Sequence, residues 1–118
     1  MSSQAVTFGQ AIANARRQIG VTQKDLASMV MKEDGSGAIS APYLNDIEHD
    51  RRRPTSDSLI RELAKATKLD VDYLFVLAGK IPEEVRQNVW DADAVASAFR
   101  SFRKACRSQK RPKQQGSR

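Results

Sequence analysis

The chain has 118 residues, 40% of them hydrophobic and 6% aromatic, which suits one domain with a mainly aliphatic core. Its single cysteine, Cys106, excludes an intrachain disulfide, and no apolar run approaches the roughly 18 residues that a membrane span needs. The N-terminus lacks the basic and apolar regions of a signal peptide. We therefore expect a reduced, soluble, cytoplasmic protein.

The formal net charge of +6 is unevenly distributed. Residues 100–118 carry eight basic residues and no acidic one, so residues 1–99 hold the other 12 of the 20 basic residues and all 14 acidic residues, a net −2. The basic pI therefore describes the C-terminal end and does not by itself indicate a DNA-binding domain. Residues 108–118 contain no hydrophobic residue and are expected to be a disordered basic tail. This tail either follows DNA phosphates or only adds solubility.

The hydrophobic spacing predicts an all-α protein, because alternating runs of β-branched residues are absent. Apolar residues at helical spacing predict a first helix over about residues 7–18, and Gly20 is its stop signal. Thr22 is the N-cap candidate of a second helix. We expect this second helix to gain most of a turn and to continue to about Glu33, before a Gly-rich segment breaks it.

The third predicted helix begins at the N-cap candidate Ser40 and ends near residue 49. Pro42 suits its first turn, where a missing N–H costs little, and Asp50 is expected to adopt the left-handed conformation that ends it. The other predicted helices are one from a cap at Thr55 or Ser56 to about residue 67, one over residues 71–78 between the cap Asp70 and Gly79, one over residues 82–90, and one over about residues 93–107.

A series of residues between the first and fifth predicted helices resembles the Cro/CI-type (XRE) helix-turn-helix family of phage repressors and bacterial regulators. The residues that carry this resemblance, over roughly residues 7–79, are Thr22, Gln23, Leu26, Ala27, Ile39, Ser40, Tyr43, Leu44, Ile47, Glu48, Pro54, Leu59, Leu63, Ala64, Leu69 and Leu74. The resemblance implies a five-helix, phage-repressor-like DNA-binding domain over residues 1–79. A helical extension over residues 80–107 and the tail over residues 108–118 would follow.

The resemblance also implies that the third helix lies in the major groove of an operator. By position, the base-contacting residues would be Ala41, Pro42, Asn45 and Asp46. Asparagine can pair with adenine and aspartate can accept from cytosine, whereas alanine and proline can contact a thymine methyl. Because no Arg or Gln stands at these positions, DNA shape is expected to supply part of the specificity. The alternative is that Asn45 and Asp46 are ordinary solvated side chains.

Family members contact phosphates on either side of the third helix. The matching candidates in this chain are Gln23, Lys24, Ser40, Tyr43, Arg51, Arg52 and Arg53. A helix N-terminus offers free N–H groups to an anion, which suits Gln23, and an arginine run suits a phosphate clamp. The alternatives are an exposed glutamine, a solvated basic loop, and an internal bond from Arg52 to Glu48.

Glu48 is expected to be structural. In the family, an arginine of the first helix pairs with this glutamate behind the recognition helix, and Arg16 stands at the matching position. Removing one partner of a partly buried pair would leave the other charge uncompensated. We therefore expect the Arg16–Glu48 pair to support both folding and DNA binding.

The C-terminal third carries more apolar residues than a five-helix core needs, which indicates a dimer surface. The candidates are Leu77, Val85, Val89, Trp90, Val95, Phe99 and Phe102. The alternative is that they pack on their own core.

These observations predict a bacterial or phage-encoded transcriptional regulator, in the first instance a repressor that binds a double-stranded DNA operator as a homodimer. A second hypothesis is an antitoxin that binds a toxin through its C-terminal helices and regulates its own operon. A third is a protein-interaction module without DNA binding. One histidine and one cysteine make no zinc site, and neither a P-loop nor a Ser/His/Asp arrangement is present, so we expect no metal, no cofactor and no enzymatic activity.

The segment between the second and third helices departs from the family pattern. A helix-turn-helix usually joins its helices through three or four residues, whereas here the turn is longer by about seven, including residues 32–38. Added loop length is inexpensive when both ends are anchored. The insertion is therefore either a tolerated surface loop or an additional contact, through Lys32, Ser36 and glycine N–H groups to a phosphate or through the loop to a partner.

Overall fold

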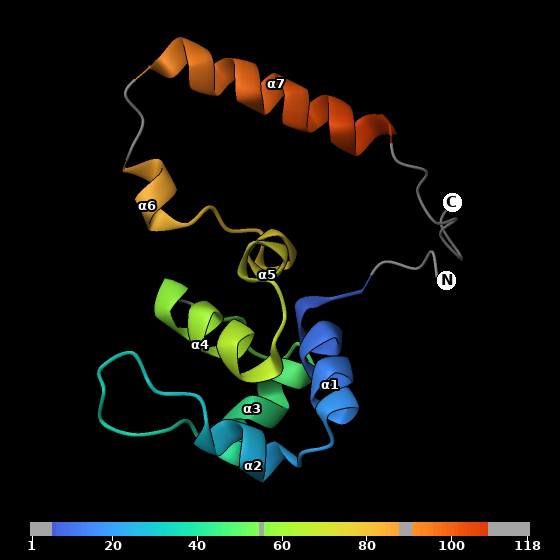
Figure 1. The fold of residues 1–118 in the computed structure, drawn as a ribbon, viewed down its shortest axis with the longest axis vertical. Helices are drawn as coiled ribbons and strands as arrows, with labels where there is room; N and C mark the ends of the chain where they lie inside the picture. The colour runs from blue at the N-terminus through green and yellow to red at the C-terminus, as the bar shows by residue number, and fades with distance from the viewer. Residues whose placement is uncertain (1–5, 55, 88–90, 109–118) are drawn as a thin grey trace. The chain divides into compact units, whose positions relative to one another are not determined.

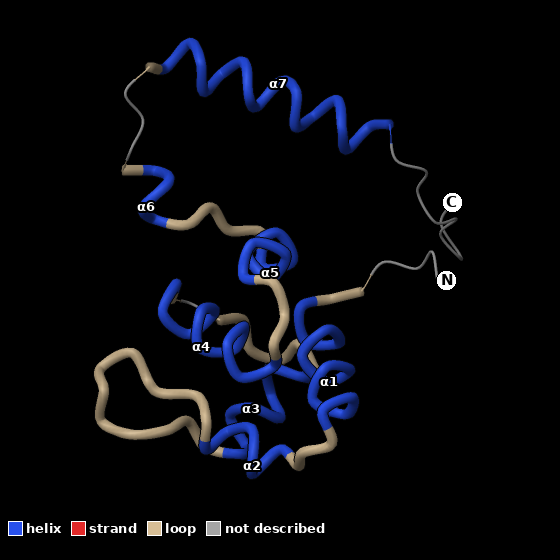
Figure 2. Tube along the Cα trace, viewed as in Figure 1, coloured by secondary structure: helices blue, strands red, loops and turns tan. Residues whose placement is uncertain are grey.

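The computed structural model describes residues 6–54, 56–87 and 91–108. These residues contain seven α-helices: α1 (Phe8–Ile19), α2 (Gln23–Ser28), α3 (Ala41–Glu48), α4 (Asp57–Thr67), α5 (Val71–Ala78), α6 (Glu83–Arg86) and α7 (Ala92–Ser108) (Figure 1). Over the same residues the chain forms no β-strand, only one isolated antiparallel bridge (Figure 2). The all-α prediction, with helices beyond the fifth, is confirmed. None of these helices is both long and apolar enough to cross a bilayer.

The chain divides into two compact units. Residues 6–83 form one unit, which holds α1 to α5, and α7 belongs to the other. The first unit extends past Gly79 because Asp57, at the start of α4, accepts hydrogen bonds from the Lys80 ammonium and from the Glu83 N–H. The Glu83 bond has an N···O distance of 2.7 Å.

Short polar side chains cap the helices of the first unit, as the sequence predicts. Thr22, Ser40 and Asp70 each accept a backbone N–H of the first turn that they precede. Ser56 is the cap of α4, and the alternative, Thr55, lies outside the described residues. Such caps satisfy N–H groups that have no partner within the helix.

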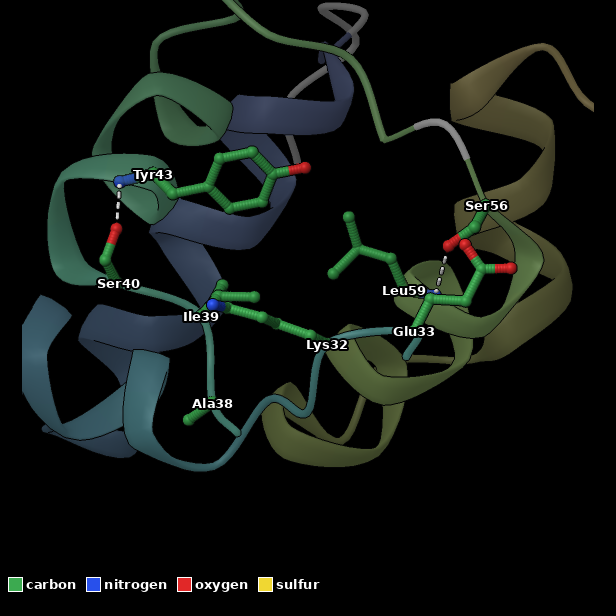
Figure 3. A pocket seen from close by; sticks show the side chains of 8 residues that line it. All are labelled: Lys32, Glu33, Ala38, Ile39, Ser40, Tyr43, Ser56 and Leu59. Carbon is green, nitrogen blue, oxygen red and sulfur yellow. Dashed lines mark hydrogen bonds between the residues drawn. The ribbon is translucent and has the colours of Figure 1, made fainter. Parts of the chain in front are cut away.

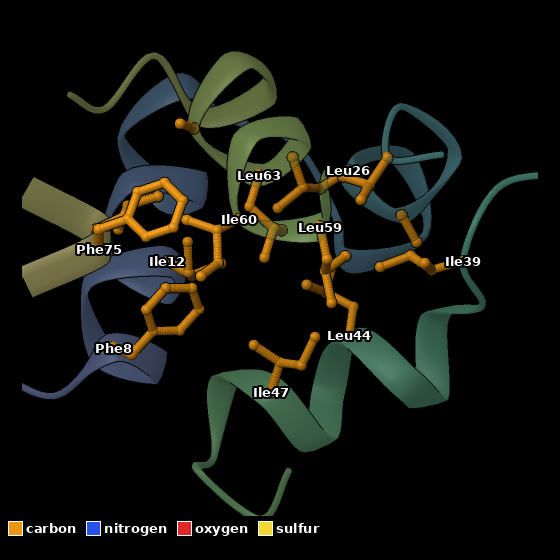
Figure 4. Close-up of a cluster of buried hydrophobic side chains, with 14 residues drawn as sticks. Phe8, Ile12, Leu26, Ile39, Leu44, Ile47, Leu59, Ile60, Leu63 and Phe75 are labelled. Carbon is orange, nitrogen blue, oxygen red and sulfur yellow. The ribbon is translucent and has the colours of Figure 1, made fainter. Parts of the chain in front are cut away.

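One mainly aliphatic core, with Phe8 and Phe75, holds α1 to α5 together (Figure 4). Its largest fully buried side chains are Ile12, Leu26, Val30, Leu44, Ile47, Ile60, Leu63 and Leu74. At roughly 1.5–3 kcal/mol for each such side chain, this burial is the main stabilising contribution to the fold. Because Leu44 and Ile47 point into it, the core also determines which face of α3 is turned outward.

The expectation that the second helix continues to Glu33 is wrong. α2 ends at Ser28, and the chain then forms a hairpin in which Met31 pairs with Ala38. The Ile39 N–H donates to the Val30 carbonyl at 2.9 Å, and both side chains are buried. Burying two β-branched residues at the base of the hairpin outweighs one further helical turn.

The two helices after α5 match their predicted bounds to different degrees. α6 covers only Glu83–Arg86 of the predicted residues 82–90, and residues 88–90 lie outside the described residues. α7 spans Ala92–Ser108, close to the predicted 93–107. The expected tail lies outside the described residues apart from Ser108, which ends α7.

Candidate nucleic-acid interface

The outer face of α3 carries the four predicted base-contacting residues. Pro42 is exposed, while Ala41, Asn45 and Asp46 are half-buried. Positions 41 and 45, like 42 and 46, are separated by four residues and therefore lie one helical turn apart. The core anchors the opposite face, so these four side chains form one short outward stripe.

A polar network behind this stripe joins three helices. Arg16 of α1 binds Glu48 of α3 through two hydrogen bonds, from Nε to Oε2 at 2.7 Å and from Nη2 to Oε1 at 3.1 Å. The Glu48 side chain is only 2% exposed and that of Arg16 only 14%. Gln23 of α2 donates from Nε2 to Glu48 Oε1 at 2.8 Å and to Asn45 Oδ1 at 3.0 Å. We call Arg16, Gln23, Asn45 and Glu48 the Glu48 network.

The Glu48 network fixes the pose of α3 and the orientation of one candidate reading residue. Arg16 also donates from Nη1 to the carbonyl of Val21 at 3.0 Å, which ties the α1–α2 turn to the same group. Among the described residues, no buried side-chain nitrogen or oxygen lacks a hydrogen-bond partner. A fully satisfied buried network holds its members in one geometry.

The Gln23 side chain is therefore bonded within the protein, whereas its position in the family pattern predicted a phosphate contact. A glutamine amide carries two N–H bonds. In this structure one N–H bond is directed to Asn45 and the other to Glu48. A phosphate contact through the Gln23 amide would require one of these bonds to break. The groups that remain for a phosphate at this place are the backbone N–H groups at the start of α2 and the exposed Lys24 beside them.

Four other predicted DNA-contacting residues form two pairs within the chain. Arg51 Nε lies 3.2 Å from Asp46 Oδ1 in an exposed ion pair, and the Arg52 guanidinium lies 5.1 Å from the centre of the Tyr43 ring. Glu48 is bound by Arg16 and Gln23 and not by Arg52. Exposed ion pairs contribute little free energy, so Arg51 can exchange Asp46 for a phosphate at low cost. Arg53 is exposed.

The contact between the end of α3 and the start of α1 was not identified from the sequence. Asp50, at φ 59°, accepts the Thr7 hydroxyl at 2.5 Å and the Gly9 N–H at 2.9 Å. A Cβ at Gly9 would lie 2.4 Å from the Ile47 carbonyl oxygen, so only glycine permits this approach. A glycine inside a helical pattern was the available signal, since it usually has a packing reason.

The inserted hairpin lies beside the first turn of α3. Together with α3 and α4 it encloses a pocket of about 450 Å³, shown in Figure 3 and lined by Lys32, Glu33, Ala38, Ile39, Ser40, Tyr43, Ser56 and Leu59. Inside the hairpin, the Gly35 N–H donates to the Lys32 carbonyl and the Ser36 N–H to Asp34. The Ser36 backbone N–H, with its hydroxyl, lowers the pKa of Asp34, which keeps this carboxylate ionised. Two N–H groups that a phosphate contact would use are therefore already bonded.

The predicted dimer residues differ in exposure. Leu77 is half-buried against the core of the first unit, and Val95 is half-buried. Val85 is 52% exposed, Phe99 44% and Phe102 57%. Val89 and Trp90 lie outside the described residues.

The described residues contain no group of three or more His, Cys, Asp or Glu side chains placed to hold a metal ion. A family model described as Helix-turn-helix matches residues 12–74, more than half of the 118-residue chain. The match covers α2 and α3 and reaches into α5. No curated protein and no solved structure matches the chain.

Proposed function

The chain belongs to the Cro/CI-type (XRE) helix-turn-helix family of DNA-binding transcriptional regulators, and from this premise we propose that it is a repressor that binds a two-fold symmetric operator as a homodimer. The observation that carries the proposal is the Glu48 network. It holds α3 with residues 41, 42, 45 and 46 outward, as a helix that enters the major groove requires.

Base readout is assigned to the outer stripe of α3. Asn45 is the main reading residue, because Gln23 orients its Oδ1, which keeps a second lone pair to accept from adenine N6, while an amide N–H can donate to N7. An asparagine amide matches the N6 and N7 atoms of adenine. Ala41 and Pro42 supply apolar contacts to thymine methyl groups, and Asp46 accepts from a cytosine amino group once Arg51 turns to a phosphate. With so few direct contacts, DNA shape contributes to the choice of site.

Phosphate contacts are assigned to the two ends of this stripe. Lys24 and the N–H groups at the start of α2 come before α3 in the chain, and Arg51 to Arg53 follow it. Ser40 and Tyr43 lie at the start of α3, where the Tyr43 ring supports Arg52. Such contacts position α3 without reading sequence. Occupying an operator is sufficient to repress, so the mechanism needs no further activity.

Selection of bound sites from random double-stranded DNA by the full-length protein tests this proposal. The expected result is a motif of two inverted half-sites with centres about one DNA turn, or a multiple of it, apart. Enrichment of a single unpaired half-site would contradict the homodimer. The absence of any enriched sequence would contradict sequence-specific regulation.

A second candidate function is an antitoxin that regulates its own operon. The observation in its favour is the exposed apolar side of α7, with Phe99 and Phe102, which a toxin could cover. Purification of the chain together with the product of the neighbouring gene, and neutralisation of that product's toxicity, would support it. A homogeneous chain that binds its operator without a second protein would favour the repressor.

A further inference from the structure

α7 carries one apolar stripe at coiled-coil spacing. Val95, Phe99, Phe102 and Cys106 follow one another at intervals of four, three and four residues, and we call them the α7 seam. Phe99, Phe102 and Cys106 are exposed, and Val95 is half-buried. Spacing of this kind keeps one side of a helix facing a partner helix along its whole length.

We propose that the α7 seam pairs with the α7 seam of a second copy of this chain in antiparallel orientation. In this register Phe99 faces Phe102 of the partner subunit, and Val95 faces Cys106 of the partner subunit. The inference deepens the proposed function, because it rests on the homodimer and specifies the helix, direction and register through which the two copies meet.

The order of the spacings is compatible with an antiparallel register. Intervals of four, three and four read the same in both directions, so the seam matches its own reversed copy at every layer. The central layers would hold four phenylalanine rings from the two copies. Aromatic pairs of this kind add to the free energy of area burial alone.

The charge distribution of α7 supports the same direction. Asp91 directly precedes the helix and Asp93 lies in its first turn, whereas Arg100 lies at its centre and Arg103, Lys104 and Arg107 lie in its C-terminal half. Parallel pairing would bring two basic halves together and align the helix dipoles. Antiparallel pairing places the acidic end of each helix beside the basic end of the other, which lowers the electrostatic energy.

Small residues beside the seam allow close approach. Ala96, Ala98 and Ala105 take three of the four positions that flank it, and Arg103 takes the fourth. Seventeen helical residues span only about 25 Å, so this contact buries a limited area. We therefore expect weak association in solution that is reinforced when two half-sites hold both copies on DNA.

Disulfide cross-linking in the full-length chain tests the direction. Val95→Cys, combined with the native Cys106, puts a thiol at both ends of the seam. The thiol at position 95 of one copy faces Cys106 of the other copy only if the two helices are antiparallel. Within one helix these positions lie about 16 Å apart, too far for a disulfide. The matched variants are the wild-type chain, Val95→Cys with Cys106→Ala, and Ser97→Cys with Cys106→Ala, where Ser97 is exposed away from the seam. Each is oxidised with diamide, with and without its selected DNA site, and helicity is checked by circular dichroism.

The expected result is a disulfide-linked dimer for Val95→Cys with native Cys106, at least tenfold above the other three proteins. Dimers from the wild-type chain and from Val95→Cys with Cys106→Ala would mean a parallel pair and overturn the proposal. Equal cross-linking of all variants, including the Ser97 control, would mean random collision and overturn it as well. No cross-linking of any variant would also overturn it. Site selection by the reduced proteins distinguishes failure of this proposal from failure of the proposed function. Inverted half-sites without the antiparallel cross-link would still support a homodimeric repressor, and only the α7 pairing would be wrong.

Discussion

At the scale of single residues, one buried carboxylate holds the candidate reading surface together. Glu48 accepts from two other helices, from α1 through Arg16 and from α2 through Gln23. A buried charge of this kind costs free energy unless it is paired and hydrogen-bonded. The Glu48 network is therefore important less for the net stability that it adds than for the single pose of α3 that satisfies it.

Replacing Arg16 tests this role. Arg16→Ala leaves Glu48 without its cation and should lower the free energy of unfolding by roughly 3 kcal/mol. DNA affinity should fall as well, because α3 loses its fixed pose. The matched control is Arg17→Ala, an exposed arginine on the same helix, expected to change stability by less than about 0.5 kcal/mol. Urea unfolding compares them, and equal midpoints would contradict the role assigned to the pair.

Gly9 sets the distance between α1 and α3. Gly9→Ala would drive a Cβ against the carbonyl oxygens of Ile47 and Glu48, at 2.4 and 2.6 Å. Overpacking against backbone costs typically 1–3 kcal/mol, so we expect a loss of about 2 kcal/mol or more. Gln18→Ala, on an exposed position of the same helix, is the control. Thermal unfolding measures both, and a Gly9→Ala protein as stable as this control would refute the close approach.

At the scale of elements, the inserted hairpin lengthens the α2–α3 turn without displacing α3. Its base is anchored by Val30 and Ile39 in the core, and its N–H groups at Gly35 and Ser36 are bonded within the loop. Residues 32–38 carry one basic and two acidic side chains, a net −1. This charge opposes a phosphate contact and favours a loop that the fold tolerates.

Shortening the hairpin separates these possibilities. Replacing residues 33–36 by Asn-Gly leaves a two-residue turn between Lys32 and Gly37, which are already paired at 2.8 Å. We expect stability within about 0.5 kcal/mol of the wild-type chain and DNA affinity within about threefold. Fluorescence anisotropy on the selected DNA site measures the affinity. A loss of more than tenfold in a folded variant would assign the insertion to the DNA interface.

The join between α4 and the segment after α5 should depend on pH. The Lys80 ammonium, followed by the Glu83 N–H, holds the pKa of Asp57 below its usual value of about 3.9. A lowered pKa in the folded state means that this stabilisation is complete above about pH 4 and is lost as the pH falls through the folded-state pKa. Asp57→Asn should therefore reduce stability by roughly 1 kcal/mol at pH 6 and by less at pH 3. A difference that is independent of pH in urea unfolding would refute the pairing.

At the scale of the whole molecule, α1 to α5 form the unit that carries the candidate DNA interface, and α7 carries the unpaired apolar seam. One short recognition helix reads few base pairs, so a regulator of this size gains specificity by using two copies. The roles proposed for the two units rest on what each exposes, a polar stripe with flanking basic residues in the first and phenylalanines in the second.

Sedimentation of a seam variant tests the role of α7. Phe99→Asp places a charge in the centre of the seam, whereas Ser97→Asp places the same charge on its outer side. We expect Phe99→Asp to be monomeric at concentrations where the wild-type chain and Ser97→Asp sediment as dimers, because an unpaired charge is strongly disfavoured in an apolar contact. Dimers of equal mass from all three proteins would exclude the seam as the interface.

Much of the fold was predictable because its signals are local. The caps Thr22, Ser40 and Asp70 stand beside apolar residues at helical spacing, and a left-handed Asp50 needs only a short polar side chain at a helix end. The hairpin was not predictable, since its stability depends on the burial of Val30 and Ile39 against helices distant in the sequence.

The candidate site likewise has features that the sequence predicted and features that it did not. The Arg16–Glu48 pair was expected from the family resemblance, and the structure places the two side chains in contact. The use of both Gln23 N–H bonds inside the protein, and the pairing of Asp46 with Arg51, depend on side-chain directions that spacing does not determine.

The most direct test of the central claim, that α3 reads DNA sequence, is site selection repeated with Asn45→Ala and Arg53→Ala beside the wild-type chain. We expect Asn45→Ala to lose the preference at one base pair in each half-site, with about 1–3 kcal/mol less discrimination there. Arg53→Ala should select the wild-type motif with lower affinity at every sequence. An unchanged motif for Asn45→Ala, at unchanged affinity, would contradict the assignment of α3 as the reading helix.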